Sequence, residues 1–203
     1  MHATLWNDPR LEDFWGHPAS EVWADYLRRS ADRFVLFMDR FSEVVPAERR
    51  LLFERLLEGG PRLLKRFEGG RPLTLIHGDA HWWDCFVPRD SHQEQVRFLD
   101  WEDWAIGAGT MHLAYMIAML WFPGRQRATE QPLLDWYYDT LLADGVAAYS
   151  RQMLDDDYRW SVLLQLLRPI WQATNNLPAG VWWPNLERNF LAVEDLGCQE
   201  LLA

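Results

Sequence analysis

The chain has 203 residues, of which 49% are hydrophobic, enough apolar material for a packed domain and too much for a disordered chain. Its formal net charge of −10 argues against nucleic acid and against an anionic membrane as partners, because negatively charged surfaces attract basic proteins. There are two cysteines, far apart, and we see neither a signal peptide nor an apolar stretch long enough to span a bilayer. We therefore expect a cytoplasmic protein.

The N-terminal part of the chain has the apolar spacing of helices. A helix is predicted over residues 21–45, with Ser20 as its N-cap. Pro46 suits the first turn of a second helix, which we expect to end at Gly59-Gly60. A short helix over residues 61–67 should follow it.

The pattern changes in the middle of the chain. Short apolar runs over residues 73–76, 85–87 and 96–101 predict three strands, separated by turns and polar loops. The first run leads into a His-Gly-Asp turn, and the third ends in Asp-Trp-Glu. These strands therefore deliver acidic side chains to their ends.

After a turn at residues 107–109, the chain is expected to be helical to its end. The predicted helices cover residues 112–122, 131–143, 155–174 and 184–202. We interpret the three aspartates at 155–157 as the acidic first turn of a helix. The fold class is then α+β and mostly helical, as one domain with helical residues 1–70, strand-forming residues 71–104 and helical residues 105–203.

Asp79, Asp84 and Asp100 are the candidate chemical groups. Asp79 and Asp84 lie in one turn after the first strand, and Asp100 follows a later strand. Carboxylates that converge in this way can hold a divalent metal and position a hydroxyl for attack on a phosphate.

Two segments together resemble a known family. They are His77-Gly78-Asp79-Ala80-His81-Trp82-Trp83-Asp84 and Leu99-Asp100-Trp101-Glu102. This pair resembles the catalytic loop and metal segment of the aminoglycoside phosphotransferase and choline kinase-like family. The opening His2-Ala3-Thr4-Leu5-Trp6 is similar to a motif of its ecdysteroid-kinase-like members. The resemblance implies the C-terminal lobe of a protein-kinase-like fold, with a small β insertion that carries the catalytic loop.

By this resemblance, Asp79 would be the catalytic base that orients the hydroxyl of the acceptor. Asp100 and Asp84 would bind Mg²⁺ with ATP or GTP. Asp84 stands where the family usually has Asn, which adds a negative charge near the nucleotide. The acceptor would be an aminoglycoside-, choline- or sterol-like alcohol, and the acidic balance of the chain slightly favours a cationic one.

His77, His81 and His112 would brace the loop. His112 stands where the family has an aspartate that accepts backbone hydrogen bonds from the loop. Trp82 and Trp83 replace small residues and are, with Glu102, candidate substrate contacts. Glu102 by itself is more typical of a solvated surface acid.

The nucleotide-binding part of such an enzyme is not recognisable. No glycine-rich phosphate loop precedes the catalytic loop, and the only lysine, Lys65, lies on a predicted helix. We therefore expect the N-terminal nucleotide lobe to be absent. The chain would then be a phosphotransferase domain that is inactive alone, or a non-catalytic pseudokinase or binding module. Its partners would be a separate N-terminal lobe or a second copy of the chain.

A metallophosphoesterase is a third interpretation, because His77-x-Asp79-x-His81 resembles a metal-binding motif. Binuclear enzymes of that kind also need an Asn-His pair, and the sequence has none. A serine hydrolase lacks its Gly-x-Ser-x-Gly turn.

Overall fold

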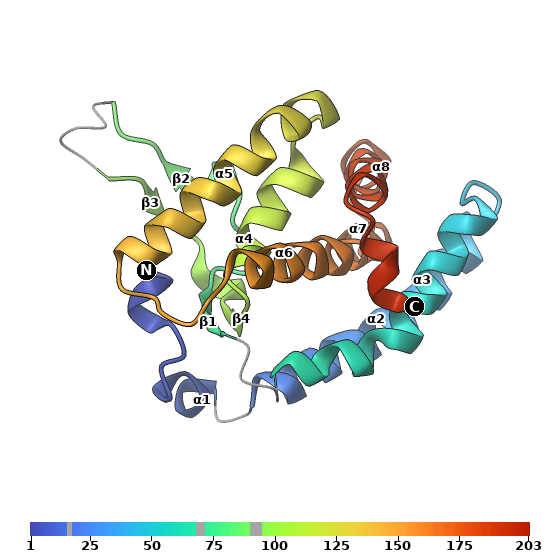
Figure 1. The fold of residues 1–203 in the computed structure, drawn as a ribbon. Helices are drawn as coiled ribbons and strands as arrows, with labels where there is room; N and C mark the ends of the chain where they lie inside the picture. The colour runs from blue at the N-terminus through green and yellow to red at the C-terminus, as the bar shows by residue number, and fades with distance from the viewer. Residues whose placement is uncertain (16–17, 68–71, 90–94) are drawn as a thin grey trace.

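The computed structural model describes residues 1–15, 18–67, 72–89 and 95–203 (Figure 1). This part of the chain is mostly helical with a few short strands, which confirms the predicted α+β class. The α-helices are α1 Arg10–Trp15, α2 Ala19–Phe41, α3 Ala47–Leu63, α4 Thr110–Ala114, α5 Pro123–Ala143, α6 Arg151–Gln165, α7 Leu167–Thr174 and α8 Ala179–Asp195. The strands are β1 Thr74–Ile76, β2 Cys85–Phe86, β3 Arg97–Phe98 and β4 Ala105–Gly107.

The first long helices form where their apolar patterns predict them, but their beginnings differ. α2 starts at Ala19 with Pro18 as its N-cap, so the prediction of Ser20 as the cap was wrong. Pro46 lies one position earlier than expected, because it is the N-cap of α3 and not a residue of its first turn. In both cases a proline that cannot donate a backbone hydrogen bond stands where no donor is needed.

The prediction that Gly59-Gly60 would end the second helix was also wrong. α3 continues to Leu63, and residues 64–67 form a 3₁₀ turn. A Cβ atom on Gly60 would lie 2.7 Å from Cδ1 of Leu27 in α2. The glycine therefore allows α2 and α3 to approach closely.

The strands form two antiparallel pairs, β1 with β4 and β2 with β3. Leu75 lies opposite Ile106 in the first pair, and Cys85 lies opposite Phe98 in the second. The strand expected over residues 96–101 is shorter, because Asp100 adopts a left-handed backbone with φ of 57°. β4 was not predicted, and Gly107 belongs to it and not to a turn.

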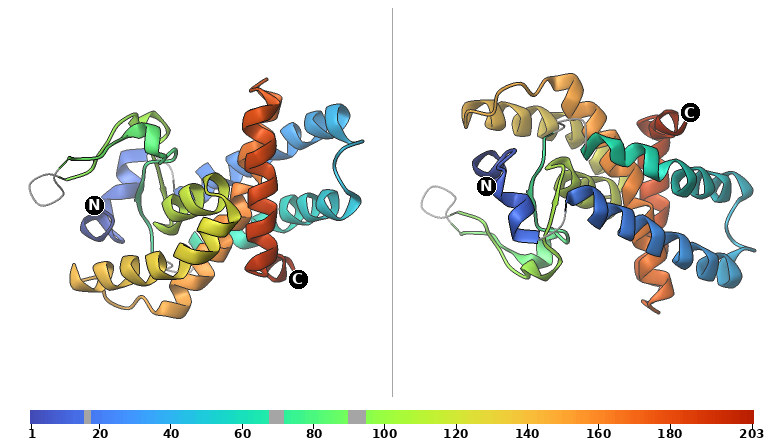
Figure 2. Two further views of the ribbon diagram at one scale, coloured as in Figure 1. Left: turned by 90° about the horizontal axis from the view of Figure 1, so that it is seen from above. Right: turned by 90° about the horizontal axis from the view of Figure 1, so that it is seen from below.

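The two strand pairs have different surroundings. β1 and β4 lie against the helices near the centre of the molecule, whereas the β2–β3 hairpin projects from the helical body (Figure 2). Residues 77–84 connect β1 to β2, so the proposed catalytic loop lies where these two regions meet.

The C-terminal helices follow the predicted pattern with shifted ends. α4 continues into a π-helix, Tyr115–Leu120, in the region of the helix expected over residues 112–122. The helix expected over 155–174 is two helices, α6 and α7, and the helix expected over 184–202 is α8 followed by a 3₁₀ turn, Cys198–Leu202.

The three aspartates at 155–157 are not the first turn of a helix, as we had expected. α6 begins at Arg151, and the Ser150 hydroxyl accepts the backbone N–H of Met153 at 3.1 Å as its N-cap. Asp157 is buried, forms an ion pair with Arg66 and accepts a hydrogen bond from another side chain. It is therefore a structural acid of the interior.

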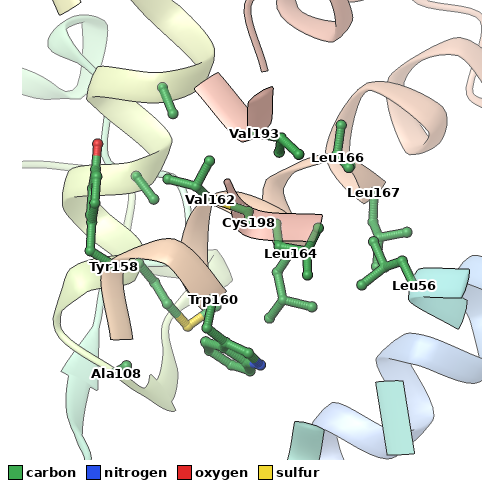
Figure 3. Packing of buried hydrophobic residues seen from close by; sticks show 14 of the residues in the cluster. Leu56, Ala108, Tyr158, Trp160, Val162, Leu164, Leu166, Leu167, Val193 and Cys198 are labelled. Atoms are coloured by element: carbon green, nitrogen blue, oxygen red, sulfur yellow. The ribbon is translucent and has the colours of Figure 1, made fainter. Parts of the chain in front are cut away.

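The core is built around α6. Trp160, Val162 and Leu164 of this helix are buried and lie among side chains of the neighbouring helices (Figure 3). α6 packs on α4 and α8, and α7 packs on α2 and α8. This packing holds α6 and α7 in place beside the loop of residues 77–84. No helix in the described part of the chain is both long and apolar enough to cross a membrane.

Candidate functional site

A tight loop connects β1 to the 3₁₀ turn Trp82–Asp84. Gly78, at its start, has φ of 85°, a conformation that glycine adopts without strain. A Cβ atom there would also collide with the backbone carbonyl of Asp103. Both the backbone conformation and the lack of space therefore require glycine at position 78. The loop packs directly against the turn Trp101–Asp103.

Asp79, His81 and Asp84 lie together in this loop. Nε2 of His81 is 3.7 Å from Oδ2 of Asp79, and Nδ1 of His81 is 3.2 Å from Oδ2 of Asp84. One possible ligand atom from each of the three residues lies within 4.8 Å of the others. The imidazole therefore stands between two carboxylates, and all three side chains are partly buried.

Arg168 of α7 binds the carboxylate of Asp79. Its Nη2 atom lies 2.9 Å from Oδ1 of Asp79 and 3.3 Å from Oδ2 of Asp103. The guanidinium also lies over the rings of Tyr115 and Trp171, 5.6 and 5.0 Å from their centroids. The pair fixes the orientation of the Asp79 carboxylate and gives it a positive neighbour.

Sequence reasoning missed Arg168, although a signal was present. It is the only charged residue between residues 162 and 174, in a stretch that is otherwise mostly apolar. A charge in a buried helix requires a partner, so a lone arginine there indicates an acid elsewhere in the chain. Tyr115 is a second missed neighbour, since its hydroxyl hydrogen-bonds to Asp79 and burial raises its pKa.

A series of hydrogen-bonded side chains binds the backbone of His77 at the start of the loop. Nε2 of His112 accepts the backbone N–H of His77. Nδ1 of His112 lies 2.9 Å from Nε2 of His2, and Nδ1 of His2 lies 2.8 Å from the hydroxyl of Tyr137. We call His112, His2 and Tyr137 the histidine relay.

The backbone determines the proton positions in this relay. A backbone N–H can only donate, so Nε2 of His112 is unprotonated and the neutral ring carries its proton on Nδ1. That proton is donated to Nε2 of His2, whose own proton on Nδ1 is donated to Tyr137. Every nitrogen of the two rings is thus used, and both rings must be neutral for the pattern to hold.

The protonation equilibria agree with this arrangement. Burial, helped by the N-terminal amino group, lowers the pKa of His2 to about 4. Burial, helped by the nearby His2 and His77, lowers the pKa of His112 well below its usual value. Burial raises the pKa of Tyr137. All three side chains are therefore neutral near pH 7.

The N-terminal segment is fixed to the site by further contacts. The hydroxyl of Thr74 in β1 donates to the carbonyl of His2 at 3.0 Å. The backbone N–H of Asn7 donates to the carbonyl of Leu73 at 2.8 Å. No role was expected for the imidazole of His2, because a contact between residues 110 positions apart cannot be predicted from the sequence.

Asp100 takes a different place from that of Asp84. It is exposed and is not part of the group formed by Asp79, His81 and Asp84. Its neighbour Leu99 is nevertheless tied to the loop, because the Leu99 N–H donates to the carbonyl of Asp84 at 2.8 Å. The Asp100 backbone is therefore close to Asp84, and its left-handed conformation is of a type that is enriched at functional sites.

His77 does not contribute its side chain to the acidic group. Its ring is buried, and Nε2 lies 2.5 Å from the carbonyl oxygen of Leu99. It also packs on Trp101, with 4.6 Å between the ring centroids. The side chain connects the loop of residues 77–84 to the segment of Asp100. A metal site made of His77, Asp79 and His81 is not assembled in the described residues.

A cavity of about 350 Å³ lies beside the loop. It is bounded by α2, the turn Trp101–Asp103 and the ends of α6 and α7, and both Gly78 and Ala80 line it. Arg168 also lines it, so Asp79 lies between two lining residues and binds a third. Of the candidate substrate contacts, Glu102 lines the cavity, whereas Trp82 and Trp83 do not.

Trp82 and Trp83 are exposed, together with other apolar side chains of the β2–β3 hairpin. The exposed fraction is 72% for Trp83, 62% for Phe86 and 73% for Val87. The facing strand region adds Val96 and Phe98, which are also exposed. We call these residues the hairpin apolar surface, and a surface of this kind is typical of a contact with another protein or another part of a protein.

The donor set of the loop fits a divalent cation. Two carboxylates and an imidazole suit Mn²⁺ or a similar ion, and carboxylates alone suit Mg²⁺, which usually takes one or two of them together with phosphate oxygens and water. Asp84 would be the first protein ligand, with Asp79 or Asp100 beside it. When bound, such a cation would neutralise the charge of nucleotide phosphates.

The chain was compared with protein-family models, curated proteins and solved structures. No protein-family model, no curated protein and no solved structure matches the chain. The function must therefore be argued from the residues and their geometry.

Proposed function

We propose that the chain is the catalytic-loop part of a phosphotransferase that acts on the hydroxyl of a small molecule, with ATP or GTP as donor and Mg²⁺ as cofactor. One observation carries the proposal. The carboxylate of Asp79 is oriented by Arg168 at 2.9 Å, at the edge of a cavity large enough for a small molecule, with Asp84 in the same loop.

Asp79 accepts the proton of the acceptor hydroxyl in this proposal. Phosphoryl transfer needs a correctly oriented nucleophile and neutralised charge more than covalent help from the protein. Arg168 keeps the Asp79 carboxylate oriented, and the histidine relay holds the preceding backbone. Asp84, with Asp100 beside it, would hold the cation that accompanies the nucleotide.

A non-catalytic binding module is the second candidate, and the same ion pair favours it. Oδ1 of Asp79 is already engaged by the guanidinium of Arg168 and is therefore not free to accept a proton from a substrate hydroxyl. The hairpin apolar surface adds a reason to expect a protein partner. Such a module would bind its ligand equally well with Asp79→Asn, because no step would depend on a base.

Calorimetric titration of Mg-ATP into the chain tests the proposal. The wild type is compared with Asp84→Ala, Asp100→Ala and the control Asp144→Ala, which removes an exposed acid at the end of α5. We expect binding in the wild type and the control, and at least about tenfold weaker binding in the two site variants. No binding to the wild type, or equal binding in all four proteins, would contradict the nucleotide site.

Transfer is then measured separately from binding. With Mg-ATP and a panel of alcohols, Asp79→Asn should lower kcat by about a hundredfold or more and leave nucleotide binding within about twofold. If alcohols are phosphorylated equally fast by Asp79→Asn, then Asp79 is not the base. If nothing is phosphorylated although Mg-ATP binds, the binding-module interpretation is favoured.

A further inference from the structure

The cavity beside Asp79 has an unusual set of charges on its α2 side. Val22, Tyr26, Arg29 and Arg33 follow one another at helical spacing along a single face of α2, and all four line the cavity. Two arginines four residues apart on one face repel each other. A helix that carries them toward a cavity is suited to a ligand that supplies negative charge.

The partners of these arginines differ. Arg168 is occupied by Asp79 and Asp103, and Arg29 lies 2.9 Å from Asp25. Arg33 has no ion pair or hydrogen bond in the described part of the chain, and its side chain is only partly exposed. Arg33 is therefore the guanidinium with its donors available to a ligand.

Three arginines act electrostatically on the hydroxyl of Tyr26. Burial raises the pKa of Tyr26, and the charges of Arg168, Arg33 and Arg29 act in the opposite direction. Three guanidiniums from two helices are thus close enough to influence one hydroxyl group. These arginines lie together at one cavity, although the chain as a whole carries a net charge of −10.

Two acids, Glu102 and Asp103, also line the cavity. Asp103 is paired with Arg168, which leaves Glu102, an exposed side chain of the turn Trp101–Asp103. The remaining lining is rich in aromatic side chains, including Trp23, Trp104 and Trp171. Flat rings of this kind pack well against a flat or apolar ligand.

We propose that the cavity binds the acceptor alcohol, and that this acceptor is a flat molecule with an anionic group, which Arg33 recognises. The inference rests on the proposed function, because the hydroxyl would be presented to Asp79. It reverses the slight preference for a cationic acceptor that the acidic composition had suggested. A local cluster of arginines decides the sign of the charge in a pocket, whereas net charge describes the whole surface.

Three matched compounds test the charge preference. They are 4-(hydroxymethyl)benzoate, its primary amide, and 4-(aminomethyl)benzyl alcohol, which share a ring and a hydroxyl and carry a negative, neutral or positive group. Their dissociation constants are measured by ligand-observed NMR with the full chain. We expect the carboxylate to bind about tenfold more tightly than the amide, and the ammonium compound to bind most weakly.

Variants then locate the preference at Arg33. Arg33→Gln should weaken the carboxylate about tenfold and leave the amide within about twofold. Arg28→Gln is the matched control, since Arg28 lies on the same helix but does not line the cavity. Glu102→Gln should tighten carboxylate binding, because it removes the opposing charge. Circular dichroism of each variant establishes that it is folded.

The outcomes separate the two proposals. An equal or stronger affinity for the ammonium compound, an unchanged carboxylate affinity in Arg33→Gln, or no binding of any compound would overturn the anionic-acceptor proposal. If the carboxylate binds through Arg33 but is never phosphorylated with Mg-ATP, the anion site stands and the phosphotransferase proposal fails. If other alcohols are phosphorylated without preference for an anion, the reverse holds.

Discussion

His112 accepts the backbone N–H of His77 and so joins the start of the loop of residues 77–84 to α4. The donor is a main-chain group that no substitution at position 77, except proline, would remove. The acceptor is a side chain, and it depends on a second imidazole for its own tautomer. The position of the loop is therefore sensitive to residues that never approach Asp79.

Removal of the His112 ring should destabilise the protein. His112→Ala leaves the His77 N–H and Nε2 of His2 without their partner, which we expect to cost about 1–3 kcal/mol of unfolding free energy. His112→Gln keeps an acceptor at a similar distance and should cost less than half of that. Urea unfolding measures both. Equal losses in the two variants would mean that ring packing, and not the hydrogen bond, is what matters.

Stability should fall between pH 6.5 and about 4 because of the relay. The pKa of His2 is lowered from 6.5 to about 4, so in this interval the unfolded chain binds a proton that the folded chain excludes. The contribution is fully present above pH 6.5, decreases by up to about 1.4 kcal/mol per pH unit for each such histidine, and levels off below the folded pKa. His112 acts in the same direction.

Urea unfolding at several pH values checks this dependence. The variant His2→Gln/His112→Gln should show a smaller slope of stability against pH than the wild type between pH 5 and 6.5. Carboxylates contribute equally to both proteins, so they cancel in the comparison. Parallel curves would show that the two rings do not exclude protons in the folded state.

Gly109 should not tolerate a side chain. Its backbone is in the ordinary helical region, with φ of −58°, so alanine causes no strain of its own. A Cβ atom would instead collide with the hydroxyl of Tyr137 and lie 2.9 Å from Nδ1 of His2. We expect Gly109→Ala to cost about 1–3 kcal/mol by opening the relay.

Gly124 provides the matched control. A Cβ atom there meets nothing within 4 Å, and the residue lies in the first turn of α5. Gly124→Ala should leave the melting temperature unchanged or raise it slightly, since alanine favours helix more than glycine does. Similar losses at both glycines would exclude the relay as the reason.

The pair of Arg168 and Asp79 should be worth more than a surface ion pair. Arg168→Met leaves Asp79 partly buried without its guanidinium, and we expect a loss of about 1–3 kcal/mol, reduced from the fully buried case because both groups are partly exposed. Arg127→Met, which breaks an exposed pair with Asp195, should destabilise the protein much less, because solvent screens exposed ion pairs. A double-mutant cycle with Asp79→Asn measures the coupling, and a coupling near zero would contradict the geometry.

The hairpin apolar surface should promote association. Trp83→Ser with Phe86→Ser removes two of its most exposed rings, and the double variant should sediment as a smaller species than the wild type at the same concentration. Lys or Glu would confound the result by adding charge, so serine is chosen. Identical sedimentation of a self-associating wild type and the variant would place the contact elsewhere.

The sequence predicts the helices of this fold better than their ends. The apolar spacing of α2 and α3 is visible because each helix buries one face. The end of α3 was misplaced because Gly60 reads as a helix stop, whereas its role is to allow contact with Leu27. A glycine required for close packing and a glycine required for a turn look identical in a single sequence.

The candidate site combines residues that are adjacent in the sequence with residues that only the tertiary structure brings to the loop. The loop from His77 to Asp84 is local, and its chemistry could be read from adjacent letters. Arg168 and His2 reach the loop only through tertiary structure, from 89 residues after Asp79 and 75 residues before His77 (168 − 79 and 77 − 2). The arginines that line the cavity could not be predicted from composition, because composition averages over the whole chain, while α2 places Arg29 and Arg33 on one face.

The place of His2 has a practical consequence for anyone who produces this protein. A purification tag or a fluorescent label joined in front of Met1 would be attached close to the ring of His2, which contacts His112, the side chain that binds the backbone of His77. Such an addition could change ligand affinity without touching the cavity. A tag placed after Ala203 would instead follow the 3₁₀ turn Cys198–Leu202, which packs against α3 and α6, and would leave the contacts of His2 unchanged.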